Sequence, residues 1–211
     1  MRHRFSRCVN AERLTAKPEC RVLDRMTAKP SWERNLRFRC TGCGNCCRDT
    51  VIPVNDEEVR RLQHGTGRRV TEIVQFVGRD RIAIDRSHPY WVRLAAGRRM
   101  MALRWRRGGA CAFLTRDNQC TVYDHRPVVC HQHPFDVTFS ETGAIERVAI
   151  SRLVPCPHEW DGHTTRRRLL ALDRQYERER SPYAEKIEAW HERRDGRRSE
   201  REFLRFLGFT L

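Results

Sequence analysis

The sequence predicts a small, cysteine-rich α+β fold of short strands and helices, followed by a helical C-terminal tail. Two observations support this class: segments of alternating polar and apolar residues occur between residues 36 and 150, and the residues after Asp161 follow the helical period. A chain of 211 residues is long enough for one domain with appendages. We therefore expect a flexible basic N-terminal segment over 1–35, a cysteine-cluster domain over 36–160 and a helical extension over 161–211.

The first elements of the domain follow from alternation and capping residues. Residues 36–40 alternate as a short strand does. Asn55, with Glu58 three residues later, is typical of a capping box at the start of a helix, which we expect to end near Gln63. Residues 71–77 suggest a second short helix.

The middle of the domain reads as strands joined by turns. Residues 79–107 contain alternating segments, with a turn expected at Gly97. Residues 135–139 and 144–150 are expected to pair as a hairpin, with Gly143 in its turn.

The tail has the apolar period of helices. We expect helices over 164–180, over 182–194 and over 199–207. Pro182 near the first turn separates the first two, because proline is tolerated at a helix start but not in its interior. Ser199 is the expected cap of the third helix.

The segment around which the chain is organised begins at residue 40 and holds four thiols in eight residues. They are Cys40, Cys43, Cys46 and Cys47. Thiolates prefer zinc, copper(I) or iron–sulfur clusters, and two cysteines separated by two residues can reach one metal. Gly42 and Gly44 allow the positive φ angles with which such a loop turns its amides toward the sulfurs.

Four more cysteines follow downstream, at Cys111, Cys120, Cys130 and Cys156. Cys46 and Cys47 are sequence neighbours, so we expect their side chains to point in different directions. Either two four-thiolate sites or one polynuclear cluster then accounts for the eight thiols. Cys8 and Cys20 lie apart from this set, and Met26 offers an alternative start that would remove both.

Composition limits the setting of this site. The formal net charge is +15, the hydrophobic fraction is 39% and the mean hydropathy is −0.75. The charged first ten residues do not form a signal peptide, and the chain lacks a run of about 18 apolar residues, so we expect a cytoplasmic protein without membrane association. In a reducing compartment, clustered cysteines indicate metal ligands rather than disulfides.

Spacing favours an iron–sulfur cluster. Cys40, Cys43 and Cys46, with the distant pair Cys156-Pro157, have the layout of a ferredoxin half-motif, which favours a 4Fe–4S cluster. Structural zinc is the alternative, since paired loops of this kind also hold zinc. In the two-site interpretation, the thiols that remain for a second centre are Cys47, Cys111, Cys120 and Cys130. Four histidines lie among the later cysteines, and we expect most of them near the ligands or on the surface: His125, His131, His133 and His158.

Four motifs in order give the chain a family resemblance: the cysteine loop, Cys111-Ala-Phe-Leu, Cys120-Thr-Val-Tyr and Arg126-Pro-Val-Val-Cys130. With these it resembles the YkgJ-type cysteine-cluster family, described as zinc- or iron-chelating, over residues 38 to 160. The resemblance implies a bacterial metal-binding protein, and a related cluster occurs in flagellin lysine N-methylases. One departure is that the family continues with arginine after the last of these cysteines, whereas this chain has His131.

Three function classes follow. The first is a metal-binding protein that holds an iron–sulfur cluster or zinc, with an unknown protein or small-molecule partner. The second is a metal-dependent enzyme, with methyl transfer suggested by the resemblance; the chain has no dinucleotide fingerprint or P-loop. The third is nucleic-acid binding, but residues 161–211 carry 13 basic and 10 acidic side chains, a balance more typical of a salt-bridged helical face.

Overall fold

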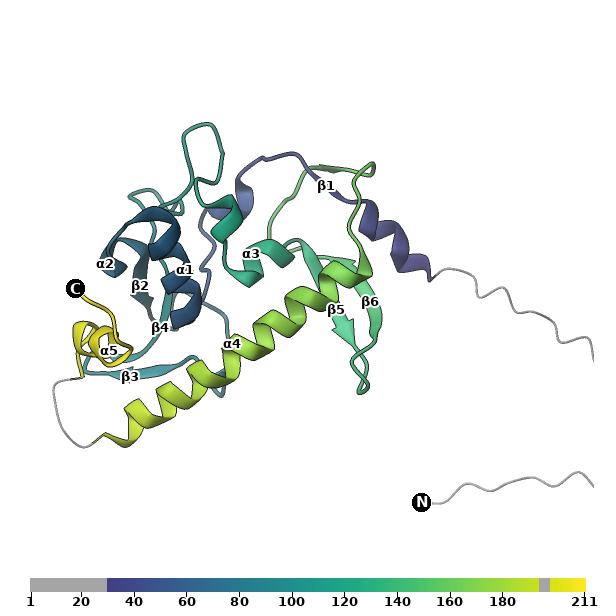
Figure 1. The fold of residues 1–211 in the computed structure, drawn as a ribbon. Coiled ribbons are helices and arrows are strands. Elements are labelled where there is room, and N and C mark those ends of the chain that lie inside the picture. The colour runs from purple at the N-terminus through teal and green to yellow at the C-terminus, as the bar shows by residue number, and fades with distance from the viewer. Residues whose placement is uncertain (1–29, 194–197) are drawn as a thin grey trace, which may run out of the picture. The chain divides into compact units, whose positions relative to one another are not determined.

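The computed structural model describes residues 30–193 and 198–211. Ser31–Leu211 form one compact unit (Figure 1). Its helices and short antiparallel strands confirm the predicted small α+β class. Most of the expected N-terminal segment, with Cys8 and Cys20, lies outside the described residues.

The unit begins with a 3₁₀ helix, η1 (Ser31–Arg37), which covers the end of the expected flexible segment and the first two residues of the strand expected over 36–40. Only β1 (Arg39–Cys40) is extended, and it pairs antiparallel with β7 (His158–Glu159). The alternation over 36–40 was misleading. Phe38 lies between η1 and β1 in the chain, and its side chain is buried against Phe135 and His158 although Phe38 is not part of a strand.

Helix α1 (Asp56–Thr66) confirms the predicted capping box. The Asn55 side chain accepts from the Glu58 N–H at 2.8 Å, while the Glu58 carboxylate accepts from the Asn55 N–H at 3.0 Å. The predicted second helix is shorter than expected, because α2 (Val70–Ile73) gives way to strand β2 (Val74–Val77). Tertiary pairing overrides the helical pattern there: β2 pairs with β4 along its whole length.

The main sheet has the order β2-β4-β3 and is antiparallel. Strands β3 (Val92–Leu94) and β4 (Gly97–Leu103) are joined by a turn in which Gly97 has φ 95°, as the sequence predicted. Met100–Leu103 are buried, so one end of β4 forms the centre of the core.

The second half of the domain holds a short helix and a hairpin. A 3₁₀ turn, η3 (Tyr123–His125), leads to α3 (Val128–Gln132), which carries Cys130. Strands β5 (Phe135–Phe139) and β6 (Ile145–Ile150) form the predicted hairpin, with Gly143 at φ 77° in its turn.

The C-terminal part differs from the prediction at one point. Helix α4 (Arg166–Glu192) is continuous through Pro182, where two helices were expected. Burial explains the continuity, since Tyr183, Ile187 and Trp190 follow the proline and are almost completely covered. Burying each such side chain contributes roughly 2 kcal/mol, which together exceeds the cost of about 3 kcal/mol for a proline within a helix.

Helix α5 (Glu200–Phe206) starts at Ser199, as predicted, with a capping box to Glu202. Figure 1 shows α4 running from beside the β5–β6 hairpin toward β3 and α5. Side chains of α4 and α5 belong to the same hydrophobic cluster as those of α1 and the main sheet. In the described part of the chain, no helix combines the length and apolar character needed to cross a membrane.

Candidate metal centre

The cysteine loop between β1 and η2 (Asn45–Cys47) depends on its two glycines. The Gly42 N–H points at the sulfur of Cys40, with a nitrogen–sulfur distance of 3.4 Å. Gly44 has φ 74° and precedes η2, and a Cβ placed there would come within 3.0 Å of the Asn118 side chain. Glycine is therefore favoured at both positions, at Gly42 because its φ of 70° is in the left-handed region and at Gly44 because of its positive φ and the close packing of Asn118.

The sulfurs of Cys46 and Cys47 lie 4.0 Å apart. The expectation that these side chains diverge is thus wrong, because the tight 3₁₀ turn of η2 brings them together. Two sulfurs bound to one tetrahedral zinc at 2.3 Å are about 3.8 Å apart, so the pair has a spacing that either a shared centre or two adjoining centres can use. Their hydrogen bond lowers the pKa of Cys46 and raises that of Cys47.

Three sets of hydrogen bonds connect the Cys156 segment to the cysteine loop. Besides the β1–β7 pair, Thr41 Oγ1 donates to the carbonyl of Pro157 at 2.8 Å, and Asn45 Nδ2 donates to the carbonyl of Pro155 at 2.9 Å. Burial and, to a smaller extent, the nearby thiols of Cys40, Cys43 and Cys46 together raise the pKa of Cys156 to about 11.

The other cysteines approach the second half of the loop. The Cys111 N–H donates to the Cys47 carbonyl at 2.8 Å. An isolated antiparallel β-bridge between Leu114 and Cys120 closes the turn that follows. Burial raises the pKa values of Cys111 and Cys130, and neighbouring thiols add to this: Cys120 and Cys46 for Cys111, and Cys111 and Cys46 for Cys130.

Arg126 is a residue whose role the sequence interpretation missed, since it was named only as part of a family motif. Its guanidinium stacks on the Tyr123 ring, 3.7 Å from the centroid, and lies 3.4 Å from Nδ1 of His131. Its positive charge acts on Cys46 and Cys130 and favours their thiolates. Arg126 thus supplies a cation beside the thiols, although His131 occupies the position of the family's arginine.

Glu58 is a second residue that sequence reasoning assigned only to a helix cap. One carboxylate oxygen accepts from the Asn55 N–H, and the other accepts from the Val128 N–H at 2.8 Å. Burial raises the pKa of Glu58 to about 7, even though both hydrogen bonds favour the ionised form. The carboxylate joins α1 to the first residue of the helix that carries Cys130.

The four histidines that lie among the later cysteines in the sequence have different surroundings. His158 Nδ1 lies 2.6 Å from the Cys156 carbonyl, whereas Nε2 of His133 is buried and has no hydrogen-bond partner in the described part of the chain. Burial, with the charge of Arg126, lowers the pKa of His131 to about 4. The ring of His125 packs against Gly65 of α1, where a Cβ would collide with it.

The donor set fits a thiophilic metal, because all eight cysteines are free thiols and one pair already has a ligand-like spacing. Within residues 30–193 and 198–211, no three histidine, cysteine or acidic side chains yet converge as a complete ligand group. The thiols would therefore have to close around an ion by local rotation.

Comparison with known proteins gives one match. A family model of the pattern CxxCxxCC, described as a "putative zinc- or iron-chelating domain", matches residues 39–150. No curated protein and no solved structure matches the chain.

Proposed function

The chain belongs to the CxxCxxCC family of zinc- or iron-chelating domains, and from this premise we propose that its eight cysteines hold two metal centres. One centre uses Cys40, Cys43, Cys46 and Cys156. The other uses Cys47, Cys111, Cys120 and Cys130.

The observation that carries this division is the pattern of hydrogen bonds around the loop. The flanks of Cys156 bond to Thr41 and Asn45, while the backbone of Cys111 bonds to that of Cys47. In the proposed division the boundary lies between Cys46 and Cys47, and the 4.0 Å separation of their sulfurs would make the two centres neighbours.

For the first centre we favour a 4Fe–4S cluster over zinc. Three thiols at intervals of three residues with a remote Cys156-Pro157 match the ferredoxin pattern. The Gly42 N–H directed at sulfur is the kind of contact that tunes such clusters.

Anaerobic purification followed by metal analysis and absorption spectroscopy tests the metal. A brown protein with four irons per first centre and absorption near 400 nm supports the cluster. A colourless protein that contains zinc supports a structural role instead.

Cys156→Ser and Cys130→Ser test the division into two centres, with Cys20→Ser as a matched control. We expect each of the first two variants to lower the metal content of one centre and to leave the spectrum of the other intact, whereas the control keeps the wild-type content. Identical losses in Cys156→Ser and Cys130→Ser would reject the division but not metal binding.

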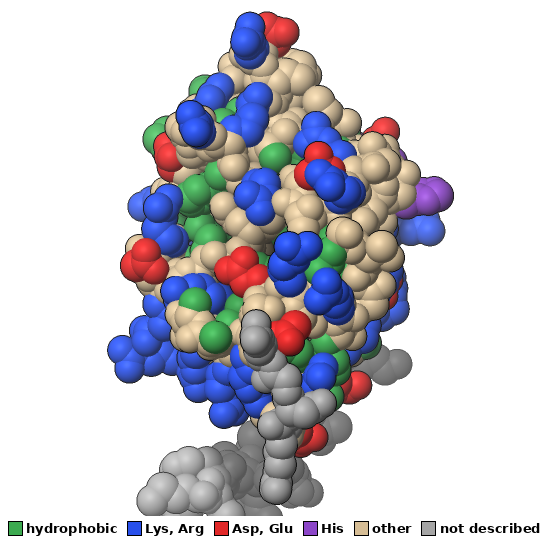
Figure 2. Space-filling model, turned by 90° about the vertical axis from the view of Figure 1, so that its left-hand side faces the viewer, with side chains coloured by type: hydrophobic (Ala, Val, Ile, Leu, Met, Phe, Trp, Pro, Cys, Tyr) green, Lys and Arg blue, Asp and Glu red, His purple; other side chains and the backbone are tan. Residues whose placement is uncertain are grey.

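Nucleic-acid binding has less support than metal binding, although the net charge is +15, because acidic side chains lie among the basic ones (Figure 2). Figure 2 shows Lys and Arg side chains spread over the face that it views, most densely at the lower left, with Asp and Glu side chains among them. Several arginines of the unit are neutralised by acids, as Arg61 is by Glu179 at 2.6 Å.

A further inference from the structure

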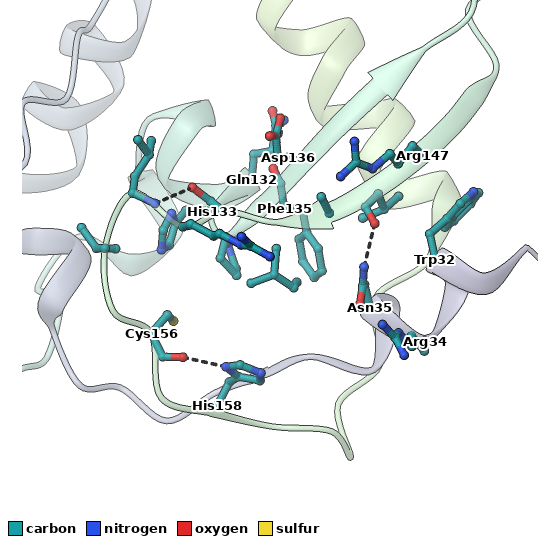
Figure 3. Close-up of a pocket in the computed structure, with 18 of the residues that line it drawn as sticks. Trp32, Arg34, Asn35, Gln132, His133, Phe135, Asp136, Arg147, Cys156 and His158 are labelled. Carbon is teal, nitrogen blue, oxygen red and sulfur yellow. Dashed lines mark hydrogen bonds between the residues drawn. The ribbon is translucent and has the colours of Figure 1, made fainter. Parts of the chain in front are cut away.

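A large groove lies beside Cys156, between η1, the β5–β6 hairpin and residues 151–160 (Figure 3). Its volume is about 1490 Å³. Pockets for drug-sized molecules span roughly 300–1,000 Å³, so the groove has room for a ligand of nucleotide size or somewhat larger. None of the metal chemistry above requires it.

The charges of the groove are one-sided. Arg34, Arg147 and Arg152 line it, and Asp136 is the one acidic residue of the lining. Among the described residues, no carboxylate lies within 4.0 Å of these three guanidinium groups. Exposed guanidinium groups form paired hydrogen bonds with carboxylate and phosphate oxygens, so an anion is the complementary ligand.

The groove also gathers exposed apolar side chains. The described chain exposes three large hydrophobic residues, and two of them line this groove: Leu153, with 89% of its surface exposed, and Trp160, with 47%. The Trp160 ring meets His158 edge to face, with 4.6 Å between centroids. Such a ring offers a face on which a planar group can stack.

Two of the arginines, Arg34 and Arg147 (Figure 3), lie apart from Trp160 within the groove, whereas Arg152 adjoins Leu153. In Figure 3, Arg34 and Arg147 lie with Trp32 at one side, whereas Cys156 and His158 lie across from them, and the Trp160 ring contacts that of His158. A ligand that contacts both sides must therefore carry its anionic group at one end and an apolar group at the other.

We propose that this groove binds an organic anion in which a planar ring is joined to a phosphate or carboxylate group. The arginines hold the anionic end, and Trp160 contacts the ring. The ring then lies near Cys156, and hence beside any metal that Cys156 holds, although the binding itself needs no metal.

Calorimetric titration of the purified full-length chain tests the proposal. The probes are AMP, which carries a phosphate, 1-naphthaleneacetate, which carries a carboxylate, and inorganic phosphate, which has no ring. The variants are Arg147→Gln and Trp160→Ala, with Arg147→Lys and Trp160→Phe as conservative partners. Arg116→Gln, at an exposed arginine outside the groove, is the matched control. Metal content and melting temperature are measured for each variant.

We expect saturable binding of AMP or of 1-naphthaleneacetate, and the arm that binds identifies the anionic group. Arg147→Gln and Trp160→Ala should each weaken it about tenfold with metal content unchanged, the conservative variants should recover part of it, and Arg116→Gln should stay within twofold. Binding of inorganic phosphate as tight as that of AMP overturns the proposal, as does the absence of binding by both ring-bearing probes or an equal loss in the control. Wild-type protein that binds a ring-bearing probe but holds no metal after anaerobic purification counts against the metal centres alone.

Discussion

The carboxylate of Glu58 accepts a hydrogen bond from the backbone N–H of Val128 across 2.8 Å, and so links two helices that are 70 residues apart in the chain. Because Val128 begins α3, this bond fixes the start of the helix on which Cys130 stands. The same carboxylate closes the capping box of α1. One buried side chain thus serves both the core and the candidate metal centre.

Replacing Glu58 by alanine should therefore lower both the stability of the core and the metal content of the candidate centre. Two buried N–H groups lose their acceptor, which costs roughly 2–5 kcal/mol of unfolding free energy. Metal at the centre that includes Cys130 should fall as well. Urea unfolding and metal analysis test this, with Glu57→Ala as the control because Glu57 is an exposed neighbour. Equal effects of the two substitutions would contradict the role of the Val128 bond.

The buried carboxyl also makes stability depend on pH. Its pKa is raised from 4.5 to about 7, so the folded state holds the proton more tightly than the unfolded state. Its contribution to stability is fully present below pH 4.5 and is lost as the pH rises through 7. Between these limits, the unfolding free energy of the wild type should fall by up to about 3 kcal/mol relative to that of Glu58→Gln. A difference that stays constant from pH 4.5 to 7.5 would show that the two backbone N–H groups keep the carboxylate ionised.

Metal removal should loosen the β1–η2 loop and the Cys156 segment before the core. Neither β1 nor η2 contains a buried residue, whereas the large hydrophobic cluster is formed by α1, α2, the main sheet, α4, α5 and the segment 110–122, which includes Cys111. Trypsin applied after metal removal should cut first at Arg48 and Arg152, and only later at Arg60 in α1. Mass spectrometry of the fragments checks the order. Simultaneous cleavage at all three sites would mean that the core itself depends on metal.

Pro182 should lower the free energy of unfolding, because it lies within α4. It cannot donate to the carbonyl one turn earlier, yet the helix continues through it. Pro182→Ala should raise the unfolding free energy by roughly 1–3 kcal/mol. Ser181→Ala, at the exposed position before it, is the control and should change stability by less than about 0.5 kcal/mol. A destabilised Pro182→Ala would indicate that the proline sets a bend on which the packing of Trp190 depends.

Local signals in the sequence predicted the elements that are held by local bonds. The capping boxes at Asn55 and Ser199 and the hairpin turn at Gly143 each involve residues within a few positions of one another. The elements that depend on contacts between distant residues were not predicted. Residues 74–77 form a strand because they pair with β4, and α4 continues past Pro182 because the side chains that follow the proline are buried.

The candidate site shows the same division. Thiol chemistry and spacing identified the eight cysteines as candidates, because ligand type is a property of the residue itself. The 4.0 Å contact of Cys46 with Cys47 depends on a tight turn, and the positions of Arg126 and Glu58 depend on packing. The groove at Trp160 is assembled from separate segments, so no single motif indicates it.

The hydrogen bond between Thr41 and Pro157, beside the β1–β7 pair, also sets an order of events during synthesis. Pro157, which accepts from Thr41, is made 116 residues later. At the usual pace of translation, the first cysteines wait roughly 10 s on the nascent chain before the segment that holds Cys156 exists. Metal insertion at a centre that needs Cys156 is therefore a late step, and until then the loop presents reduced thiols to oxidants and to competing ions in the cell.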